Sequence, residues 1–512
     1  MRSRWLAVLL LAACGPTKET EPNDAFQQAT FLKAGAKAVG TIASPGDQDW
    51  YRIDSAGDTA FSARIGGIRE VDFVLTLLDK DRVPLKKVDE TVAGGDEALL
   101  DASLRPGAYY LVVGNKNEKA ANAGQEYELS TKNEPAAGRE REPNDKALQA
   151  TPIEPSGTAR GHHWPTKDLL SEDPEAGEED WYSVEVSREG LFLLNADVSE
   201  VRNVDPILEV YDASGYKLKD LDAGGVGEGE SLRSFGVRGP GRFLLRLRGK
   251  HKGAGNAELP YDLMTELLPY QGRVEFEPND QLADATPVNL DSIQGAISPA
   301  GDADWYKVAV DSGAKTLLRV ELSGLPGADL VLSLKDPVGG DLLVVDNMGK
   351  EQPEVLTGWG STGGEVVFSV TEKSGRKADA RQPYTLTRKL IPAQDGLEWE
   401  PNNSTAAVQA LKAGESVDGY FAPKGDEDWY EFNLYQKGAV SLELTGVFLV
   451  TPTLTLFDQE YAELGSAAAT RPGEPVTFAR ELEPGTYAVR LKPADPGQAN
   501  TRDKYSLRVR VR

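Results

Sequence analysis

The chain has little sulfur and little histidine, and these shortages exclude several kinds of protein. Its 512 residues contain one cysteine, Cys14, so no disulfide can form within the chain. Its three histidines, His162, His163 and His251, leave no His-Glu-x-x-His pair of the kind that holds zinc in metalloproteases. The sequence also lacks a Walker A loop, a Rossmann glycine fingerprint and a Gly-x-Ser-x-Gly nucleophile elbow.

Positive charge and long apolar runs are scarce as well. The chain has 56 lysines and arginines against 81 aspartates and glutamates, a formal net charge of −25. This balance argues against a phosphate-binding surface for nucleic acid and against electrostatic docking on anionic lipid. No segment after the N-terminal region reaches the 18 or so apolar residues of a membrane span. The 40% hydrophobic and 27% charged residues are typical of globular domains.

The N-terminal segment, MRSRWLAVLLLAACG, places two arginines before a short apolar run that ends at Cys14. This pattern predicts an export signal over residues 1–14. The residues Leu11 to Cys14 resemble the lipobox of bacterial lipoproteins, which implies that Cys14 is acylated and anchors the chain to a membrane. We expect a bacterial cell-envelope location, at the outer membrane and facing the periplasm or the cell surface. The alternative is an ordinary secretory signal with an incidental cysteine.

Two short phrases recur four times along the chain. The first phrase is Glu-Pro-Asn followed by Asp or Asn, at 21–24, 142–145, 277–280 and 400–403. The second phrase ends in Asp-Trp-Tyr, at 46–51, 177–182, 301–306 and 425–430. The Asp-Trp pairs begin at 49, 180, 304 and 428, so they recur every 124 to 131 residues. A fixed period of this length indicates four tandem copies of one unit.

Each copy also carries patterns typical of β-strands. In DFVLTLLD (72–79) apolar residues alternate and a final aspartate enters a turn. A Gly turn with an aromatic run, as in PGAYYLVV (106–113), and a closing Tyr-x-Leu strand follow in the same order in every copy. We predict an all-β chain of four tandem jelly-roll-like antiparallel β-sandwich domains. We call the predicted domains modules 1 to 4, and they span residues 17–133, 138–268, 273–390 and 396–512.

Taken together, these phrases resemble the bacterial pre-peptidase C-terminal domain, a jelly-roll-like β-sandwich usually appended to secreted proteases. The phrases are also similar to the collagen-binding domains of secreted collagenases. Those domains bind calcium through a corresponding Glu-x-Glu-Pro-Asn-Asp segment and the aspartates before the aromatic strand. The resemblance covers nearly the whole chain after the signal segment, and it implies Ca²⁺ as the cofactor.

The residues themselves also favour calcium. A second glutamate stands two positions before each Glu-Pro-Asn, and residues at i and i+2 of an extended segment point to the same side. With the acids before Asp-Trp-Tyr, each copy gathers about six side-chain oxygens, the type and number that Ca²⁺ prefers. The candidate ligands are Glu19, Glu21, Asn23, Asp24, Asp47 and Asp49 in module 1; Glu140, Glu142, Asn144, Asp145, Glu178 and Asp180 in module 2; Glu275, Glu277, Asn279, Asp280, Asp302 and Asp304 in module 3; and Glu398, Glu400, Asn402, Asn403, Asp426 and Asp428 in module 4.

An alternative reading of the same residues is structural capping, because Asp and Asn after a proline commonly start a turn. Two copies depart from the pattern. Module 4 has Asn403 in place of an aspartate, one carboxylate fewer, so we expect weaker binding there. Module 2 has Glu178 and a longer loop, with 38 residues from Glu142 to Asp180 against 27 or 28 elsewhere.

The aromatic residues of the second phrase have different expected positions. In DWYSVEV (180–186), alternation places Tyr182 on one face with Val184 and Val186, and Trp181 on the other. We expect each tyrosine in the core and each tryptophan beneath the segment that begins at Glu-Pro-Asn. The alternative for the tryptophan is an exposed binding anchor. His162 and His163 lie in the long stretch of module 2, where we expect a solvated loop, with a metal site as the alternative.

These observations lead to one expected function and two alternatives. We expect a non-catalytic, lipid-anchored envelope protein that acts in binding, adhesion or spacing through calcium-stabilised modules. Its partner would be an envelope or extracellular protein or a polysaccharide, and not nucleic acid. One alternative is an accessory subunit that presents substrate to a separate secreted protease. The other is a hydrolase using paired carboxylates, which requires two of them in a cleft about 5–10 Å apart.

Overall fold

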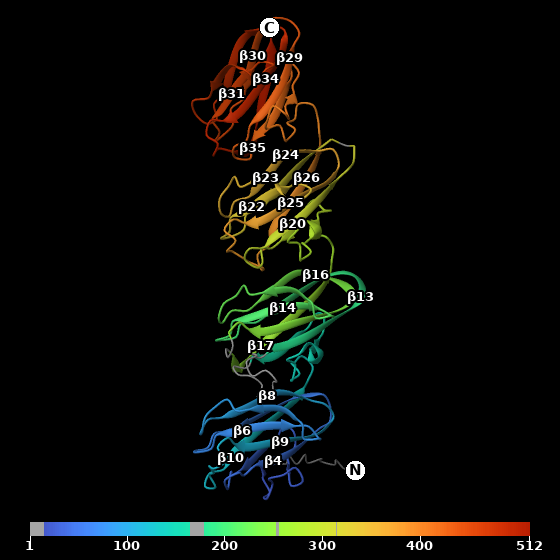
Figure 1. Cartoon of the computed structure of the whole chain (residues 1–512), viewed down its shortest axis with the longest axis vertical. Helices are drawn as coiled ribbons and strands as arrows, with labels where there is room; N and C mark the ends of the chain where they lie inside the picture. The colour runs from blue at the N-terminus through green and yellow to red at the C-terminus, as the bar shows by residue number, and fades with distance from the viewer. Residues whose placement is uncertain (1–14, 164–178, 252–254, 314) are drawn as a thin grey trace, which may run out of the picture. The chain divides into compact units, whose positions relative to one another are not determined.

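The computed structural model describes residues 15–163, 179–251, 255–313 and 315–512 (Figure 1). Cys14, the predicted signal segment 1–14 and Glu178 therefore lie outside the described residues. The chain divides into two compact units: the first ends at Leu268, and the second runs from Pro269 to Arg512 and includes Arg233–Gly236. Over the described ranges, we find no helix of sufficient length and apolarity to cross a membrane.

Module 1, in the first unit, consists of two five-stranded sheets. One sheet has the order β1-β3-β10-β5-β8 and the other the order β2-β4-β9-β6-β7. Buried residues from both sheets, such as Phe61 of β5 and Leu111 of β9, form one core cluster, so the sheets pack face to face. The strands are β1 (Thr17–Lys18), β2 (Thr30–Phe31), β3 (Lys37–Gly40), β4 (Asp49–Ser55), β5 (Thr59–Ile65), β6 (Phe73–Leu78), β7 (Pro84–Val88), β8 (Glu97–Leu104), β9 (Gly107–Asn115) and β10 (Tyr127–Pro135).

Module 2, in the same unit, joins its strands into a single seven-stranded sheet. Its strand β13 is 20 residues long and covers the segments that form the separate β4 and β5 of module 1. Its elements are the 3₁₀ turn η1 (Ala147–Gln149) and the strands β11 (Thr151–Ile153), β12 (Thr158–His163), β13 (Glu179–Val198), β14 (Pro206–Asp212), β15 (Lys217–Leu221), β16 (Ser231–Gly249) and β17 (Asn256–Pro269).

The second unit repeats the two-sheet pattern twice, each time with one five-stranded and one four-stranded sheet (Figure 1). In module 3 the sheet orders are β18-β20-β25-β22-β23 and β19-β26-β21-β24. Its elements are η2 (Leu282–Asp284), β18 (Thr286–Pro287), β19 (Ser292–Gly295), β20 (Ala303–Val310), β21 (Thr316–Leu322), β22 (Leu330–Lys335), β23 (Asp341–Val345), β24 (Glu354–Ser361), β25 (Gly364–Glu372) and β26 (Tyr384–Pro392).

Module 4 has the sheet orders β27-β29-β34-β31-β32 and β28-β35-β30-β33. Both of its sheets contribute to one buried cluster, for example through Leu442 of β30 and Val489 of β34. Its strands are β27 (Gln409–Ala410), β28 (Ser416–Phe421), β29 (Asp428–Leu434), β30 (Gly438–Leu444), β31 (Pro452–Phe457), β32 (Glu463–Ala468), β33 (Val476–Leu482), β34 (Gly485–Pro493) and β35 (Asn500–Val511).

The all-β fold class predicted from the sequence is confirmed, because the described helices are only short 3₁₀ turns. The expected burial of the Asp-Trp-Tyr tyrosines is also confirmed. The side chains of all four are fully buried: Tyr51, Tyr182, Tyr306 and Tyr430. The alternating pattern of β4, β13, β20 and β29 therefore turns these tyrosines into the sandwich.

The tryptophans lie on the opposite face of these strands, and in modules 2 and 4 the segment that follows Glu-Pro-Asn covers them. Trp181 packs against Ala147 and Ala150, and Trp429 packs against Val408. These contacts confirm the predicted covering of the tryptophan in modules 2 and 4. In module 1, Trp50 meets the edge of Tyr110 with ring centroids 6.0 Å apart, and Phe26 of the covering segment meets the same ring at 6.1 Å.

Candidate metal centres at the start of each module

The Glu-Pro-Asn segment is held by the same hydrogen bonds in every module. In module 1 the backbone N–H of Asn23 donates to Glu21 Oε2 at 3.0 Å, and the N–H of Trp50 donates to the Asn23 carbonyl at 3.1 Å. The asparagine thus links the segment to the start of the Asp-Trp-Tyr strand. The corresponding asparagines are Asn144, Asn279 and Asn402, and all four are fully buried. The Glu-Pro peptide bond is cis in all four copies.

The glutamate two positions earlier lies behind this segment. Glu19 Oε1 accepts the backbone N–H of Thr41 at 2.7 Å, and the other oxygen of this carboxylate points inward. A glycine precedes the donor residue, and a Cβ on Gly40 would lie 2.2 Å from Glu19 Oε2 and 2.4 Å from Tyr127 Oη. Only glycine leaves room there for the carboxylate and the phenol. The same arrangement recurs at Gly161, Gly295 and Gly419.

A pair of buried tyrosine hydroxyls forms the floor of each site. In module 1, Tyr51 and Tyr127 place their hydroxyl oxygens 2.8 Å apart, and Tyr127 donates to Asp49 Oδ2 at 2.6 Å. The phenols hold the inner carboxylates in place, as outer-shell groups do around metal ligands. The other pairs are Tyr182 with Tyr261, Tyr306 with Tyr384, and Tyr430 with Tyr505.

The predicted acids come together in modules 1, 3 and 4, whereas in module 2 Glu140 groups with Asp101 and His162. The carboxylate oxygens of each of the following groups lie within 4.8 Å of one another: Glu19, Glu21 and Asp49; Glu21, Asp24 and Asp47; Glu275, Glu277 and Asp304; and Glu398, Glu400 and Asp428. Asp302 and Asp426 add their charges to the neighbouring glutamates of their modules. Asp280 and Asn403 are exposed, and Asp145 is half-buried.

Several buried oxygens of these clusters have no hydrogen-bond donor among the described residues. They are Asn23 Oδ1, Asp49 Oδ1, Asn279 Oδ1, Asp426 Oδ1, and both carboxylate oxygens of Asp428. A buried polar atom without a partner is costly, and carboxylate and amide oxygens in this number are what Ca²⁺ coordinates. The residues present therefore fit a calcium ion.

The pKa shifts of the clustered carboxyls also favour a bound cation. Burial, reinforced by the charge of Glu19, raises the pKa of Asp49 to about 9, while a hydrogen bond from Tyr127 opposes the shift. Burial together with the charge of Glu398 raises the pKa of Glu400 to about 8. Burial and neighbouring acids also raise the pKa of Glu275, Asp426 and Asp428 well above the ordinary range. A divalent cation would remove this penalty by balancing the carboxylate charges.

Capping, the alternative reading of these residues, describes part of the same geometry. Asp47 Oδ2 accepts the N–H of Ala43 at 2.5 Å, and Asp426 Oδ2 accepts the N–H of Ala422 at 2.9 Å. Each of these aspartates uses one oxygen to cap its loop. The second oxygen of Asp426 is one of the buried atoms without a donor, so the cap does not satisfy the whole carboxylate.

Within each unit, the Glu-Pro-Asn segment of the later module also pairs with a strand of the earlier one. The N–H of Ser103, in β8 of module 1, donates to the Glu142 carbonyl at 3.1 Å. In the second unit, the N–H of Gly360, in β24 of module 3, donates to the Glu400 carbonyl at 2.7 Å. The candidate centres of modules 2 and 4 therefore lie where one module joins the preceding one.

Module 2 differs from the other copies, and the sequence-based expectation for its histidines is wrong. His162 and His163 were expected in a solvated loop, but both are buried and belong to β12. Although burial opposes it, the carboxylates of Asp101 and Glu140 raise the pKa of His162 to about 9. A signal was available in the sequence, because Gly161 stands where Gly40, Gly295 and Gly419 stand in the other copies.

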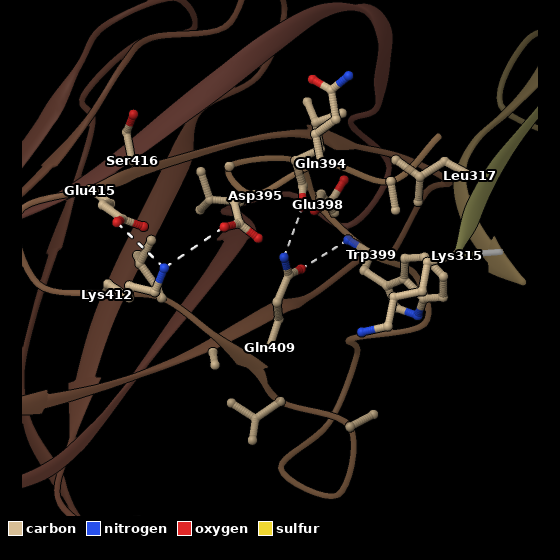
Figure 2. A pocket seen from close by; sticks show the side chains of 18 residues that line it. Lys315, Leu317, Gln394, Asp395, Glu398, Trp399, Gln409, Lys412, Glu415 and Ser416 are labelled. Carbon is tan, nitrogen blue, oxygen red and sulfur yellow. Dashed lines mark hydrogen bonds and ion pairs between the residues drawn. The ribbon is translucent and has the colours of Figure 1, made fainter. Parts of the chain in front are cut away.

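A separate pocket of about 460 Å³ lies in the second unit beside Trp399, the residue between the two glutamates of module 4 (Figure 2). Two of its polar side chains, those of Gln409 and Lys412, have partners within the lining. Gln409 accepts the N–H of Trp399 and donates to the Leu397 carbonyl, and Lys412 pairs with Asp395 and Glu415.

No known family model and no curated protein matches the sequence. Among solved structures, a pre-peptidase C-terminal domain of a collagenase from Bacillus anthracis is similar, with 15% identity over 20% of this chain and 93% of that one and a TM-score of 0.18. A β-glucosidase from Paenibacillus barengoltzii is similar at 13% identity over 23% of this chain and 13% of that one, with a TM-score of 0.14. The PBSX exported protein XepA is similar at 10% identity over 39% of this chain and 83% of that one, with a TM-score of 0.15. The first is a domain of the class that the four repeated motifs resemble.

Proposed function

We propose that the chain is a non-catalytic binding and spacing protein of the bacterial cell envelope, whose β-sandwich modules are stabilised by Ca²⁺. Buried oxygens that lack a hydrogen-bond donor and face other carboxylates are the observation that carries this proposal. Their position at the start of a module suggests a stiffening role. Calcium there would hold together the Glu-Pro-Asn segment, the Asp-Trp-Tyr strand and, in module 4, the seam with module 3.

The burial of the aspartate that begins each Asp-Trp-Tyr motif supports a non-catalytic role. A general acid or base has to reach a substrate atom within hydrogen-bond distance. Asp49, Asp304 and Asp428 are fully buried behind the Glu-Pro-Asn segment, beside the tyrosine pairs, so a polymeric substrate would not reach them. A hydrolase using paired carboxylates is accordingly not the function that we propose.

The proposed attachment to the membrane rests on the N-terminal sequence. Acylation of Cys14 would tether the chain to the outer membrane and expose its modules to the periplasm or the surface. Metabolic labelling with a fatty acid tests this directly. Label should appear on the wild type and be lost in Cys14→Ser, and labelling that persists in this variant would refute the assignment.

The binding role is tested with an array of matrix proteins and envelope polysaccharides, probed with the chain from Gly15 onward. We expect retention on a protein or polysaccharide ligand in millimolar Ca²⁺, weaker retention in EDTA, and the same loss in Asp428→Asn. Turnover of a substrate by the chain alone, lost in Asp49→Asn, would contradict the non-catalytic assignment. Co-purification with a secreted protease would favour the accessory role instead.

A further inference from the structure

The acidic cluster of module 2 has different neighbours from those of the other modules. The β-sheet register pairs the glycine of each site with the tyrosine of the closing strand: Gly40 with Tyr127, Gly161 with Tyr261, Gly295 with Tyr384, and Gly419 with Tyr505. The next two residues are therefore equivalent in the four modules. They are Thr41 and Ile42, Ala296 and Ile297, and Tyr420 and Phe421, but His162 and His163 in module 2.

Both imidazoles of module 2 are directed at carboxylates. His162 Nδ1 lies 3.1 Å from Asp101 Oδ2, which belongs to module 1, and 3.8 Å from Glu140 Oε1. His163 Nδ1 lies 3.8 Å from Asp180 Oδ2. The counterpart of His163 in modules 1, 3 and 4 is an apolar core residue, so a titratable group at this position is a particular feature of module 2.

A lysine from module 1 is the third nitrogen-bearing side chain, after the two imidazoles, that contacts the carboxylates of this cluster. Lys86, in β7, places its Nζ 2.8 Å from Glu142 Oε1, and both side chains are buried. In module 3 the equivalent position holds Leu343, because the register sets Leu343 opposite Leu334 as it sets Lys86 opposite Leu77. Module 3 therefore offers no ammonium group from this position to the cluster of module 4.

Lys86 and the two imidazoles contact carboxylates that a calcium ion in module 2 would have to bind. Calcium binding there would require Glu142 to give up Lys86, which would leave a buried ammonium group without its carboxylate. Breaking a buried ion pair in this way is strongly unfavourable. Asp101 is likewise engaged, since Arg139 Nη1 lies 3.4 Å from its Oδ1 and His162 lies on its other oxygen.

We propose that in module 2 the side chains of Lys86, His162 and His163 replace Ca²⁺, so that this cluster is a metal-independent latch between modules 1 and 2. The inference rests on the proposed function, since it removes module 2 from the modules that would hold calcium. The latch holds the first unit together when calcium is scarce. The calcium response of the chain then comes from module 1 itself and from the second unit.

Counting bound calcium by equilibrium dialysis of the four-module chain tests this assignment. We expect the variant Lys86→Leu, His162→Thr, His163→Ile to bind one ion more per chain than the wild type. This variant gives the cluster of module 2 the residues that stand at the equivalent positions of modules 3 and 1. Asp49→Asn should lower both counts by one. Four ions on the wild type, or Zn²⁺ binding that is lost in the triple variant, would overturn the proposal.

If no ion binds to any module, the calcium part of the proposed function is refuted, but the latch is not. A second measurement tests the latch in that case. Lys86→Leu and Glu142→Gln are made singly and together, and unfolding is followed in EDTA. We expect a coupling of about tenfold in the unfolding constant, as for contacting buried partners. Lys37→Leu, which removes an exposed lysine of module 1, is the matched control and should change little. Strictly additive effects of the two substitutions would overturn the latch.

Discussion

Replacing Glu400 with glutamine tests the cluster of module 4, because the substitution removes one buried charge and nearly preserves the shape of the side chain. The amide oxygen of glutamine can still accept the N–H of Asn402, which lies 2.9 Å from Glu400 Oε2. The perturbation therefore acts on charge and on metal ligation. Without metal the buried charge destabilises the module, whereas with Ca²⁺ the carboxylate is a ligand. The substitution should therefore raise stability in the absence of Ca²⁺ and lower it in the presence of Ca²⁺.

The size of the effect follows from the pKa of Glu400. Burial, with the charge of Glu398 nearby, raises this pKa from 4.5 to about 8. The difference of about 3.5 units, at 1.36 kcal/mol per unit, gives an upper limit of about 5 kcal/mol for the cost of the ionised form. Allowing for relaxation and water entry, we expect Glu400→Gln to stabilise the metal-free module by ~2–3 kcal/mol near pH 8. For a domain of this size the melting temperature should rise by roughly 10 °C.

The assay is differential scanning calorimetry of the four-module chain, with EDTA and with millimolar Ca²⁺. The variant should melt above the wild type in EDTA and below it in Ca²⁺, where the lost carboxylate weakens binding to the folded state. Glu415→Gln is the matched control, because Glu415 is exposed and pairs with Lys412 at the surface. A shift of the same sign in both buffers would refute the reasoning.

Three further predictions follow from the same geometry. The pKa of the Glu400 carboxyl rises on folding, so its contribution to the stability of the folded state is present below pH 4.5 and is lost as pH rises toward 8. The stabilisation of module 4 by Ca²⁺ should therefore grow between about pH 4.5 and pH 8 in thermal melts. Gly419→Ala should lower the melting temperature of module 4, because its Cβ would lie 2.4 Å from Tyr505 Oη, whereas exposed Gly414→Ala, at a positive φ, reports backbone strain alone. Trp429→Ala should destabilise module 4 by ~3–5 kcal/mol in denaturant unfolding, because Trp429 packs on Phe457 under the covering segment, and an effect near zero would contradict that packing.

Much of the fold was predictable from the sequence because the chain repeats itself four times. Alternation along DWYSVEV assigned Tyr182 to the core and Trp181 to the covered face, and both positions are confirmed. The spacing of two between Glu19 and Glu21 predicted that their carboxylates share one side, and they meet Asp49 as one group. The alternation of residues along a strand and the repetition of motifs along the chain are enough for such inferences.

Other parts of the site depend on strand register, which single phrases do not reveal. The pairing of Tyr51 with Tyr127 joins residues 76 apart in sequence, and it follows only once β4 and β10 are placed in facing sheets. The glycine that leaves room for the glutamate carboxylate and the tyrosine hydroxyl stands nine positions before Asp49, Asp304 and Asp428. The sequence did contain this signal.

The surroundings of module 2 were harder to predict. His162 and His163 lie in the copy with the longest stretch between its two phrases, and that length suggested a loop where a strand is present. Lys86 belongs to a different module from Glu142, so the contact between them depends on how one module docks on the next.

Calorimetric melting of the full chain near pH 8 is the most direct test of whether the acidic clusters are calcium sites. Millimolar Ca²⁺ should raise the melting temperature of the wild type relative to EDTA. The rise should shrink in Asp428→Asn and shrink further when Asp49→Asn and Asp304→Asn are added. Superimposable melting curves of the wild type in the two buffers would contradict calcium as the ion that these carboxylates hold.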